Sequence, residues 1–275
     1  MTTTGEARSR PRYAPAVLPQ VMGIVNVTPD SFSDGGQFFD HPAAIAHGLS
    51  LLDEGATVLD VGGESTRPGA QPVAVDEELR RVIPVVEALA EHARVSIDTR
   101  KPEVARAAVA AGATLVNDIS ASLWEVAADT GAGWVAMHMQ GDPATMQQAP
   151  HYADVVGEVC AFLERRAQEA EAAGIGEVWL DPGIGFGKSM AHNLTLLAHL
   201  DRVVDLGWPV LVGTSRKGTF GRILAASDGV DGLVPPDDRL AGSVASEVWC
   251  LHKGAAMVRA HDVRAAVQAV KVVAA

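Results

Sequence analysis

The sequence predicts an α/β protein that folds as a single-domain (β/α)₈ barrel, also called a TIM barrel. Short segments rich in β-branched residues alternate with longer amphipathic segments rich in Ala, Leu, Glu and Arg, a pattern typical of parallel strands covered by helices. Eight such pairs follow Gln20 in the 275-residue chain, and a barrel of this kind typically takes about 250 residues. The alternation alone leaves an open doubly wound sheet as the structural alternative.

The strand predictions rest on short runs of apolar and β-branched residues that end at a polar residue or a glycine. In chain order, the predicted strands cover residues 21–26, 57–61, 94–98, 114–119, 134–138, 177–181, 209–213 and 256–261.

The helix predictions rest on amphipathic segments, several of which have a Pro or an acidic residue near the start, as helix N-termini prefer. In chain order, the predicted helices cover residues 42–54, 76–91, 102–111, 123–131, 153–173, 190–206, 237–253 and 262–273. No linker, low-complexity segment or charge block divides the chain. Residues 20–275 are therefore predicted to form one barrel domain, preceded by a flexible leader over residues 1–19.

The composition excludes several classes of function. A formal net charge of −12 argues against nucleic acid or an anionic membrane as the main partner, so an anionic ligand would need a local basic site. No apolar run approaches the ~20 residues of a membrane span, and the N-terminal stretch lacks the apolar core of a signal peptide. Cys160 and Cys250 show no metal-site or disulfide spacing, which favours packed thiols in a reducing compartment. We therefore expect a cytoplasmic protein.

Polar residues stand at nearly every predicted strand end. They are Asn26, Asp98, Asn117, Asp118, His138, Asp181, Ser215, Arg216, Lys217, Arg259 and His261. Any one of them could simply cap the following helix. Capping cannot account for all of them, because Asn117 and Arg259 lie inside their strand patterns. In a (β/α)₈ barrel the active site lies at the carboxyl ends of the strands, so these side chains are expected to converge there.

The residue types indicate what this site would bind. Asp98, Asn117 and Asp181 suit a flat heterocycle whose edge presents N–H donors, because an ionised carboxylate accepts two parallel hydrogen bonds. A basic wall supplies the opposite charge and implies an anionic group on the ligand. Its predicted members are Arg216, Lys217, Arg259 and His261.

Two loops, at residues 27–39 and 62–75, are longer than usual βα connections and rich in turn-forming residues. Loops of this kind over a barrel mouth often act as lids, with surface decoration as the alternative. The stretch "DPGIGFGK" at 181–188 is only a weak phosphate-loop signal, because it has neither P-loop nor dinucleotide-binding spacing. His41, His92 and His138 are isolated and are not expected to bind a metal.

Together these stretches resemble the dihydropteroate synthase family from residue 21 to residue 273. The matching stretches, in family order and spacing, are "GIVNVTPDSFSDGG", "DVGGESTRPGA", "SIDTRKPEVA", "NDIS", "MHMQGDPATMQ", "LDPGIGFGK", "SRK" and "VRAHDV". The resemblance implies a (β/α)₈ barrel, usually a homodimer, that joins hydroxymethyl-dihydropterin pyrophosphate to para-aminobenzoate and releases pyrophosphate with the help of Mg²⁺. We hypothesise an SN1-like route for this reaction.

The resemblance also implies roles for individual residues. Those expected to hold the pterin are Asp98, Asn117, Asp181 and Lys217. Those expected to bind pyrophosphate are Asn26, Arg259 and His261, with Asn26 also contacting Mg²⁺. Those expected to shape the para-aminobenzoate site are Thr66, Arg67, Pro68, Phe186, Ser215 and Lys217. Arg216 and Asp34, the latter in the first long loop, are placed with the substrate-binding residues.

The chain departs from the family pattern at three places. They are Gln140 where an Arg is common, Ala121–Ser122 where Gly-Gly is usual, and Gly218–Thr219 beside the para-aminobenzoate rim. Three alternative functions remain: a catalytically silent pterin-binding paralogue, a pterin-binding methyltransferase barrel and a sulfonamide-insensitive synthase. The combined "TRPGA", "SRK" and "VRAH" stretches count against the methyltransferase, which has no use for a pyrophosphate site.

Overall fold

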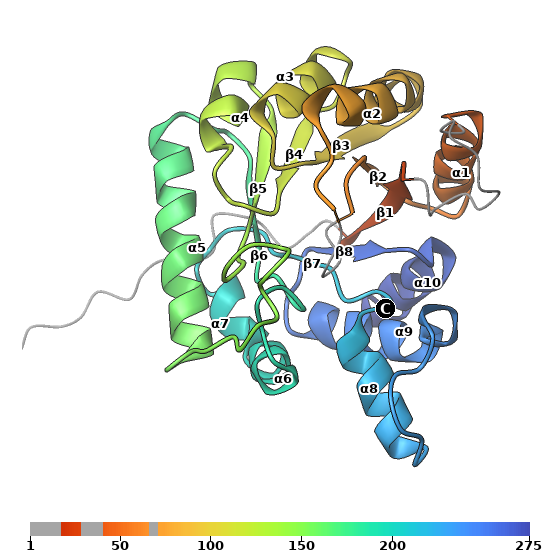
Figure 1. Ribbon diagram of the computed structural model, residues 1–275, viewed down its shortest axis with the longest axis vertical. Helices are drawn as coiled ribbons and strands as arrows, with labels where there is room; N and C mark the ends of the chain where they lie inside the picture. Colours follow the sequence, from red (N-terminus) through yellow and green to blue (C-terminus); the bar gives the residue numbers. More distant parts are fainter. Residues whose placement is uncertain (1–17, 29–40, 66–70) are drawn as a thin grey trace, which may run out of the picture.

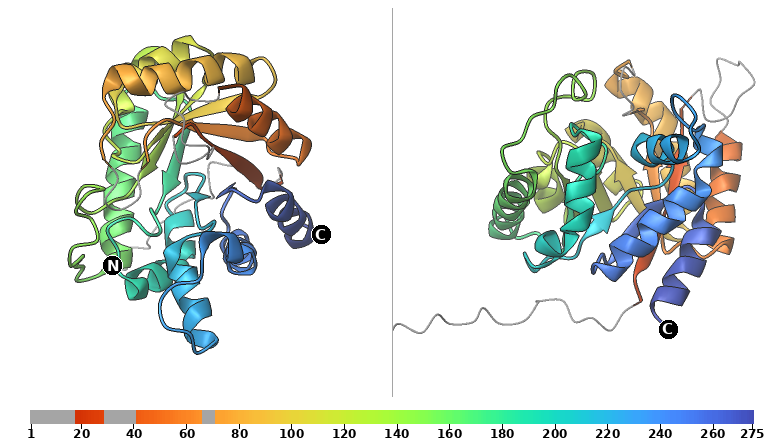
Figure 2. Two further views of the ribbon diagram at one scale, coloured as in Figure 1. Left: turned by 45° about the vertical axis from the view of Figure 1, so that its right-hand side comes forward. Right: turned by 90° about the horizontal axis from the view of Figure 1, so that it is seen from below.

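Eight parallel strands form the centre of the molecule and helices surround them, as the computed structural model shows for residues 18–28, 41–65 and 71–275 (Figures 1 and 2). The strands are β1 (Gln20–Asn26), β2 (Val58–Gly62), β3 (Arg94–Asp98), β4 (Leu115–Asp118), β5 (Gly133–Met137), β6 (Val178–Asp181), β7 (Leu211–Val212) and β8 (Met257–Ala260). All but two of the predicted leader residues lie outside this described part of the chain.

The strand order confirms the barrel. Neighbouring strands run β6-β5-β4-β3-β2-β1-β8-β7, and all of the paired strands are parallel. The two ends of this sheet meet where Leu180 pairs with Val210 and the Leu180 N–H donates to the carbonyl of Pro209 at 2.9 Å. This sequential order and closure exclude the open doubly wound sheet.

Each strand is followed by a helix, with two helices after β6 and two after β7, and α8 projects at the bottom of Figure 1. Their bounds are α1 (His41–Asp53), α2 (Val75–Ala90), α3 (Pro102–Ala110), α4 (Trp124–Thr130), α5 (Val155–Ala172), α6 (Met190–Ala198), α7 (Leu200–Val204), α8 (Gly218–Ser227), α9 (Leu240–His252) and α10 (Val263–Val273), with a short 3₁₀ helix at Pro236–Asp238. None of these described helices has the length and apolarity needed to cross a bilayer.

Two helix predictions need correction. The helix expected over 190–206 breaks at His199, whose backbone leaves the helical region (φ −113°, ψ 29°), and becomes α6 and α7. Helix α8 (Gly218–Ser227) was not predicted, and it contains Gly218 and Gly221, which have low helix propensity. Packing explains Gly221 instead: a Cβ atom there would lie 2.5 Å from Nε of the buried Arg239 side chain.

An apolar layer closes the lower part of the barrel and sets the orientation of the strands. One side chain from each of seven strands packs into it: Met22, Val58, Leu115, Val135, Trp179, Leu211 and Met257. Because side chains alternate between the two faces of a strand, the residue two positions further on points to the same side. The next inward-facing residue on each strand therefore lies above the apolar layer, nearer the carboxyl end of the barrel.

Candidate active site at the carboxyl end of the barrel

A layer of polar side chains lies directly above the apolar layer. Asp60, Asn117 and Arg259 each stand two residues beyond an apolar-layer residue on their strands. Arg259 donates from Nε to Asp60 Oδ2 at 2.6 Å and from Nη2 to Asp98 Oδ2 at 2.9 Å, and Asn117 Nδ2 donates to the same Asp60 oxygen at 2.9 Å. Side chains from β2, β3, β4 and β8 thus form one hydrogen-bonded network.

Asp60 is a site residue that the sequence analysis missed. Its side chain is fully buried, and Oδ1 has no hydrogen-bond partner among the described residues. Buried polar atoms are normally paired, so this oxygen marks a position where a ligand donor fits. The available signal was a carboxylate inside the apolar strand run "TVLDV", where an unpaired charge would be costly.

Asp181 and Lys217 form the opposite side of the site. Asp181 Oδ1 accepts from the Gly183 N–H at 2.7 Å, and Lys217 donates to the carbonyl of Ile184 while its Nζ lies 4.7 Å from the centre of the Phe186 ring. Burial raises the pKa of Asp181, against the opposing charge of Lys217. Burial also lowers the pKa of Lys217 to about 8, against the opposing charge of Asp181. Water therefore solvates both charged groups poorly, so a bound ligand can interact with them strongly.

The carboxyl group of Asp98 lies close to the balance between its protonated and ionised forms at neutral pH. Burial raises its pKa to about 7 although the positive charge of Arg259 opposes the shift, and the negative charges of Asp60, Glu78 and Asp118 add to the increase. The side chain is 13% exposed. A donor-rich ligand edge would therefore decide whether this group is ionised.

His261, Ser215 and Asn26 lie at neighbouring strand ends. Ser215 Oγ accepts from the His261 N–H at 3.1 Å and lies 3.1 Å from Nδ1 of the same residue. Asn26 ends β1 and is paired with Gly62, which in turn is paired with Asp98. The structure therefore brings the ends of β1, β2 and β3 together.

Arg216 requires a correction to the predicted basic wall. Its guanidinium forms a two-pronged ion pair with Asp262, at 3.0 and 2.8 Å, and a third contact with Asp237 at 3.2 Å. Its backbone takes the left-handed conformation (φ 56°), and its side chain pairs with Asp262 whereas that of Lys217 bonds to Ile184. The charge of Arg216 thus joins the segment after β7 to the start of α10, and the wall consists of Lys217, Arg259 and His261.

Four predicted substrate-binding residues lie outside the described residues: Asp34, Thr66, Arg67 and Pro68. The same holds for most of the first long loop and the middle of the second.

Two departures from the family pattern have structural explanations. The Gln140 amide pairs with the backbone of His151, donating to its carbonyl at 2.9 Å and accepting from its N–H at 3.1 Å, so this position stabilises a loop and supplies no charge. Ala121 sits in the turn after β4 with φ 49°. The Asp118 carboxylate stabilises that turn by accepting from the backbones of Ser120, Ser122 and Leu123 at 2.6 to 2.9 Å.

The loop between β6 and α6 is held by a buried lysine. Lys188 is 2% exposed, and its Nζ donates to the carbonyls of His138, Gly183 and Phe186 at 3.0 to 3.1 Å. It also lies 2.9 Å from Nδ1 of His138. Because these acceptors surround the ammonium, Lys188 fixes the loop and is not presented to a phosphate group.

A Lys188→Met substitution is expected to lower the free energy of unfolding by about 3 kcal/mol, because three buried carbonyl oxygens lose their donor. Urea denaturation at neutral pH measures the effect. Lys271→Met, at an exposed position of α10, is the control and should change stability by less than ~0.5 kcal/mol. A loss below about 1 kcal/mol in Lys188→Met would show that the loop does not depend on these bonds.

Comparisons with known proteins agree with this geometry. The family model described as "Pterin binding enzyme" matches residues 22–261. The dihydropteroate synthase of Escherichia coli K12 is 48% identical over 94% of this chain and 91% of its own. A solved structure of Xanthomonas albilineans dihydropteroate synthase with 4-aminobenzoic acid has a TM-score of 0.84 at 52% identity, covering 92% of this chain and 91% of that one. Another, in complex with 7,8-dihydropteroate, has a TM-score of 0.80 at 49% identity and covers 92% of each chain. The chain belongs to the dihydropteroate synthase family of pterin-binding enzymes.

Proposed function

We propose that this chain condenses 6-hydroxymethyl-7,8-dihydropterin pyrophosphate with para-aminobenzoate to give 7,8-dihydropteroate and pyrophosphate. The observation that carries this proposal is the polar layer at the barrel mouth, in which Asp60, Asp98, Asn117 and Arg259 form one network. Family membership supports it, and so do the Xanthomonas structures, whose ligands are one of the two substrates and the product.

The pterin would lie between Asp98, Asn117, Asp181 and Lys217. The two carboxylates can accept from the N–H donors of its guanidine-like edge, and the Lys217 ammonium can donate to the ring carbonyl and nitrogen. The para-aminobenzoate would lie nearer the rim. Phe186, beside Lys217, and Ser215 are the described members of that site, and Asp34, Thr66, Arg67 and Pro68 are its members from sequence resemblance.

The pyrophosphate would be bound by Arg259, His261 and Asn26. Among the described residues, no three His, Cys, Asp or Glu side chains gather as metal ligands. The family resemblance implies that Asn26 would hold Mg²⁺ through its amide oxygen, a ligand that suits a hard cation that keeps most of its waters. When bound, Mg²⁺ would add positive charge beside the leaving group.

The bond between the pterin methylene carbon and the pyrophosphate oxygen would break first, with the electron pair leaving on pyrophosphate. The resulting cation is delocalised over the dihydropterin ring, and the aniline nitrogen then attacks it and loses a proton. Arg259 and His261 would stabilise the departing anion, while Asp98 and Asp181 would hold and stabilise the cationic ring. The aniline lone pair is free at neutral pH, so this SN1-like route requires no strong general base.

The test of the function is dihydropteroate formation and pyrophosphate release by the purified protein with both substrates, with and without Mg²⁺. Turnover that needs both substrates is expected. Binding of the pterin pyrophosphate without product would instead establish the silent paralogue. Competition between a sulfonamide and para-aminobenzoate in the same assay separates a sensitive from an insensitive synthase.

The activity is expected to have a narrow pH optimum between about pH 7 and 8. Asp98 must be ionised to accept from the pterin, and it gains its charge as pH rises through about 7. Lys217 must be protonated to donate, and it loses its charge as pH rises through about 8. The measurement is kcat/KM for pterin pyrophosphate against pH, which should rise and then fall.

The matched variant for this profile is Lys217→Arg, because arginine stays protonated throughout the range. It should lower activity yet remove the alkaline decrease. An unchanged alkaline decrease would show that another group titrates there.

The homodimer and the cytoplasmic location also remain proposals. Three large apolar side chains on α9 and α10, Leu240, Trp249 and Val272, are 46%, 47% and 77% exposed, which supports an interface on this side of the barrel. Light scattering of the purified protein gives its mass directly. A monomer at micromolar concentration would contradict the dimer.

A further inference from the structure

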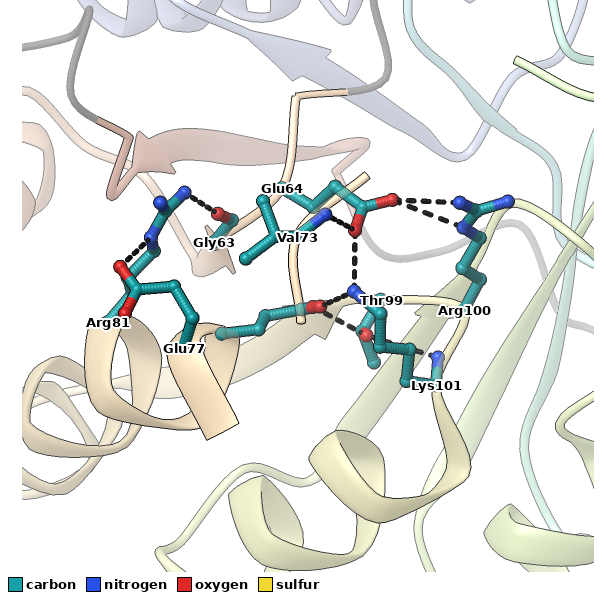
Figure 3. A network of polar contacts seen from close by, with 9 residues as sticks. Gly63, Glu64, Val73, Glu77, Arg81, Thr99, Arg100 and Lys101 are labelled. Carbon is teal, nitrogen blue, oxygen red and sulfur yellow. Dashed lines mark hydrogen bonds and ion pairs between the residues drawn. The ribbon is translucent and has the colours of Figure 1, made fainter. Parts of the chain in front are cut away.

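A buried ion-pair network joins the segment after β2 to the segment after β3 (Figure 3). Its centre is Lys101, whose ammonium contacts Glu64 at 2.5 Å and also pairs with Glu78. The side chains of Glu78, Glu64 and Lys101 are only 1%, 9% and 16% exposed. Breaking an ion pair that is shielded from water costs much more free energy than breaking one at the surface.

The network holds both ends of the segment from Gly63 to Val73. Glu64 Oε2 accepts from the Val73 N–H at 3.0 Å, and Arg100 pairs with the other oxygen of Glu64 at 3.1 Å. From helix α2, Arg81 donates to the carbonyl of Gly63 at 2.8 Å. Figure 3 shows these contacts in one view, from Arg81 and Gly63 on the left to Arg100 on the right.

The same network supports the turn that follows Asp98. Glu78 Oε1 accepts from the Thr99 hydroxyl at 2.7 Å, and Thr99 Oγ1 accepts from the Lys101 N–H at 3.2 Å. A small pocket lies between the network and the active site, and it is lined by Glu64, Glu78, Asp98, Thr99, Arg100 and Ile119. The buried carboxylates therefore border the same space as the Asp98 side chain.

Electrostatics make Lys101 the critical member. Burial raises the pKa of Glu64, but the hydrogen bonds from Lys101 and Val73 and the positive charges of Lys101 and Arg100 together outweigh it, so that the pKa is lowered. Without the ammonium, Glu78 would lose its ion-pair partner and Glu64 would keep only Arg100, so more of their negative charge would act on each other and on Asp98. Arg259, Asp60, Asp118 and Lys217 are further charged groups that interact with Asp98.

We propose that Lys101 is a positioning residue for the synthase reaction: by pairing with Glu64 and Glu78 it fastens the segment after β2 to the segment after β3, and so holds Asp98 in its substrate-binding position. The proposal rests on the proposed function. It assigns Lys101 no contact with substrate.

The test compares Lys101→Met with the parent in kinetics and in hydrogen exchange. We expect KM for pterin pyrophosphate to rise about tenfold while kcat changes less than about threefold, because a misplaced binding group weakens binding before it affects chemistry. The Val73 amide should exchange faster, because its acceptor Glu64 is released. Lys101→Arg keeps a cation able to bridge two carboxylates and should restore both values.

The matched control is Arg106→Met on α3, the helix that begins directly after Lys101. Its ion pair with Asp129, at 2.8 Å, is exposed, so KM and Val73 exchange should stay at parent values. A Lys101→Met protein that melts at a lower temperature but keeps the parent KM and Val73 exchange would overturn the proposal, since Lys101 would then be purely structural.

A milder variant keeps the test decisive if Lys101→Met does not fold. Glu64→Gln removes one charge but retains an acceptor for the Val73 N–H. It should raise KM by about threefold, and an unchanged KM would overturn the proposal. If the parent makes no dihydropteroate, the proposed function fails, whereas Val73 exchange still decides whether Lys101 fastens the two segments.

Discussion

Arg259→Met is expected to reduce kcat/KM for pterin pyrophosphate by about a hundredfold to a few thousandfold. The substitution removes the cation that bonds to both Asp60 and Asp98 and that, in the proposed reaction, would face the leaving pyrophosphate. Breaking such a shielded charge pair costs about 3–5 kcal/mol, and a rate factor of ten corresponds to about 1.4 kcal/mol. Asp98 would also lose its main opposing charge, so its pKa would rise further and the pterin would meet a neutral acid.

Steady-state kinetics across pH 6–9 measures this effect, and two variants control for it. Arg94→Met removes an arginine whose partner is Glu177, at 2.6 Å, at the opposite end of the barrel, so activity should be nearly unchanged. Arg259→Lys keeps the charge but cannot bond to both carboxylates in the same way, so it should fall between Arg259→Met and the parent. Parent activity in Arg259→Met would remove Arg259 from the mechanism.

Asp181→Asn is expected to weaken pterin pyrophosphate binding about a hundredfold, at the lower end of the 2–5 kcal/mol that follows loss of a buried charged partner. The amide can still accept from the Gly183 N–H, so the loop after β6 should keep its conformation. Its NH₂ group, however, would face the N–H donors of the pterin edge. Calorimetric titration with the pterin substrate measures the change in affinity.

The control for this variant is Asp201→Asn, an acidic residue on α7 whose side chain is 50% exposed. It should bind the pterin as the parent does. If Asp181→Asn also binds normally while its thermal stability is unchanged, the pterin edge is not recognised by this carboxyl group.

Much of the barrel could be predicted because its signals are local. Each strand carries its own β-branched run, and a period of two along that run decides which residues face inward. The strand predicted at 94–98 matches β3 in both bounds, and that at 21–26 begins one residue after β1. Asn117, Asp181 and Arg259 could be recognised as unusual for the same reason, because each interrupts an apolar pattern near a strand end.

Contacts between distant segments could not be predicted in this way. Asp60 is a site residue because it bonds to Arg259, which lies 199 positions away in the sequence. No local pattern links the two. Lys188 follows a glycine-rich loop that suggests phosphate, yet the carbonyl of His138, 50 positions earlier, helps enclose its ammonium. Helix α8 was missed because Gly221 is required by the Arg239 side chain and not by the local backbone.

Arg216 and Lys217 separate what the sequence determines from what the tertiary structure determines. The sequence by itself determined a basic pair after β7, a (β/α)₈ barrel and an acidic edge for a donor-rich ring. Only the tertiary structure decided that Arg216 binds Asp262 while Lys217 reaches the Ile184 carbonyl. The physical reason is that periodicity sets which way a side chain points along one strand, whereas the partner of a charge depends on which distant segments the closed barrel brings within hydrogen-bonding distance.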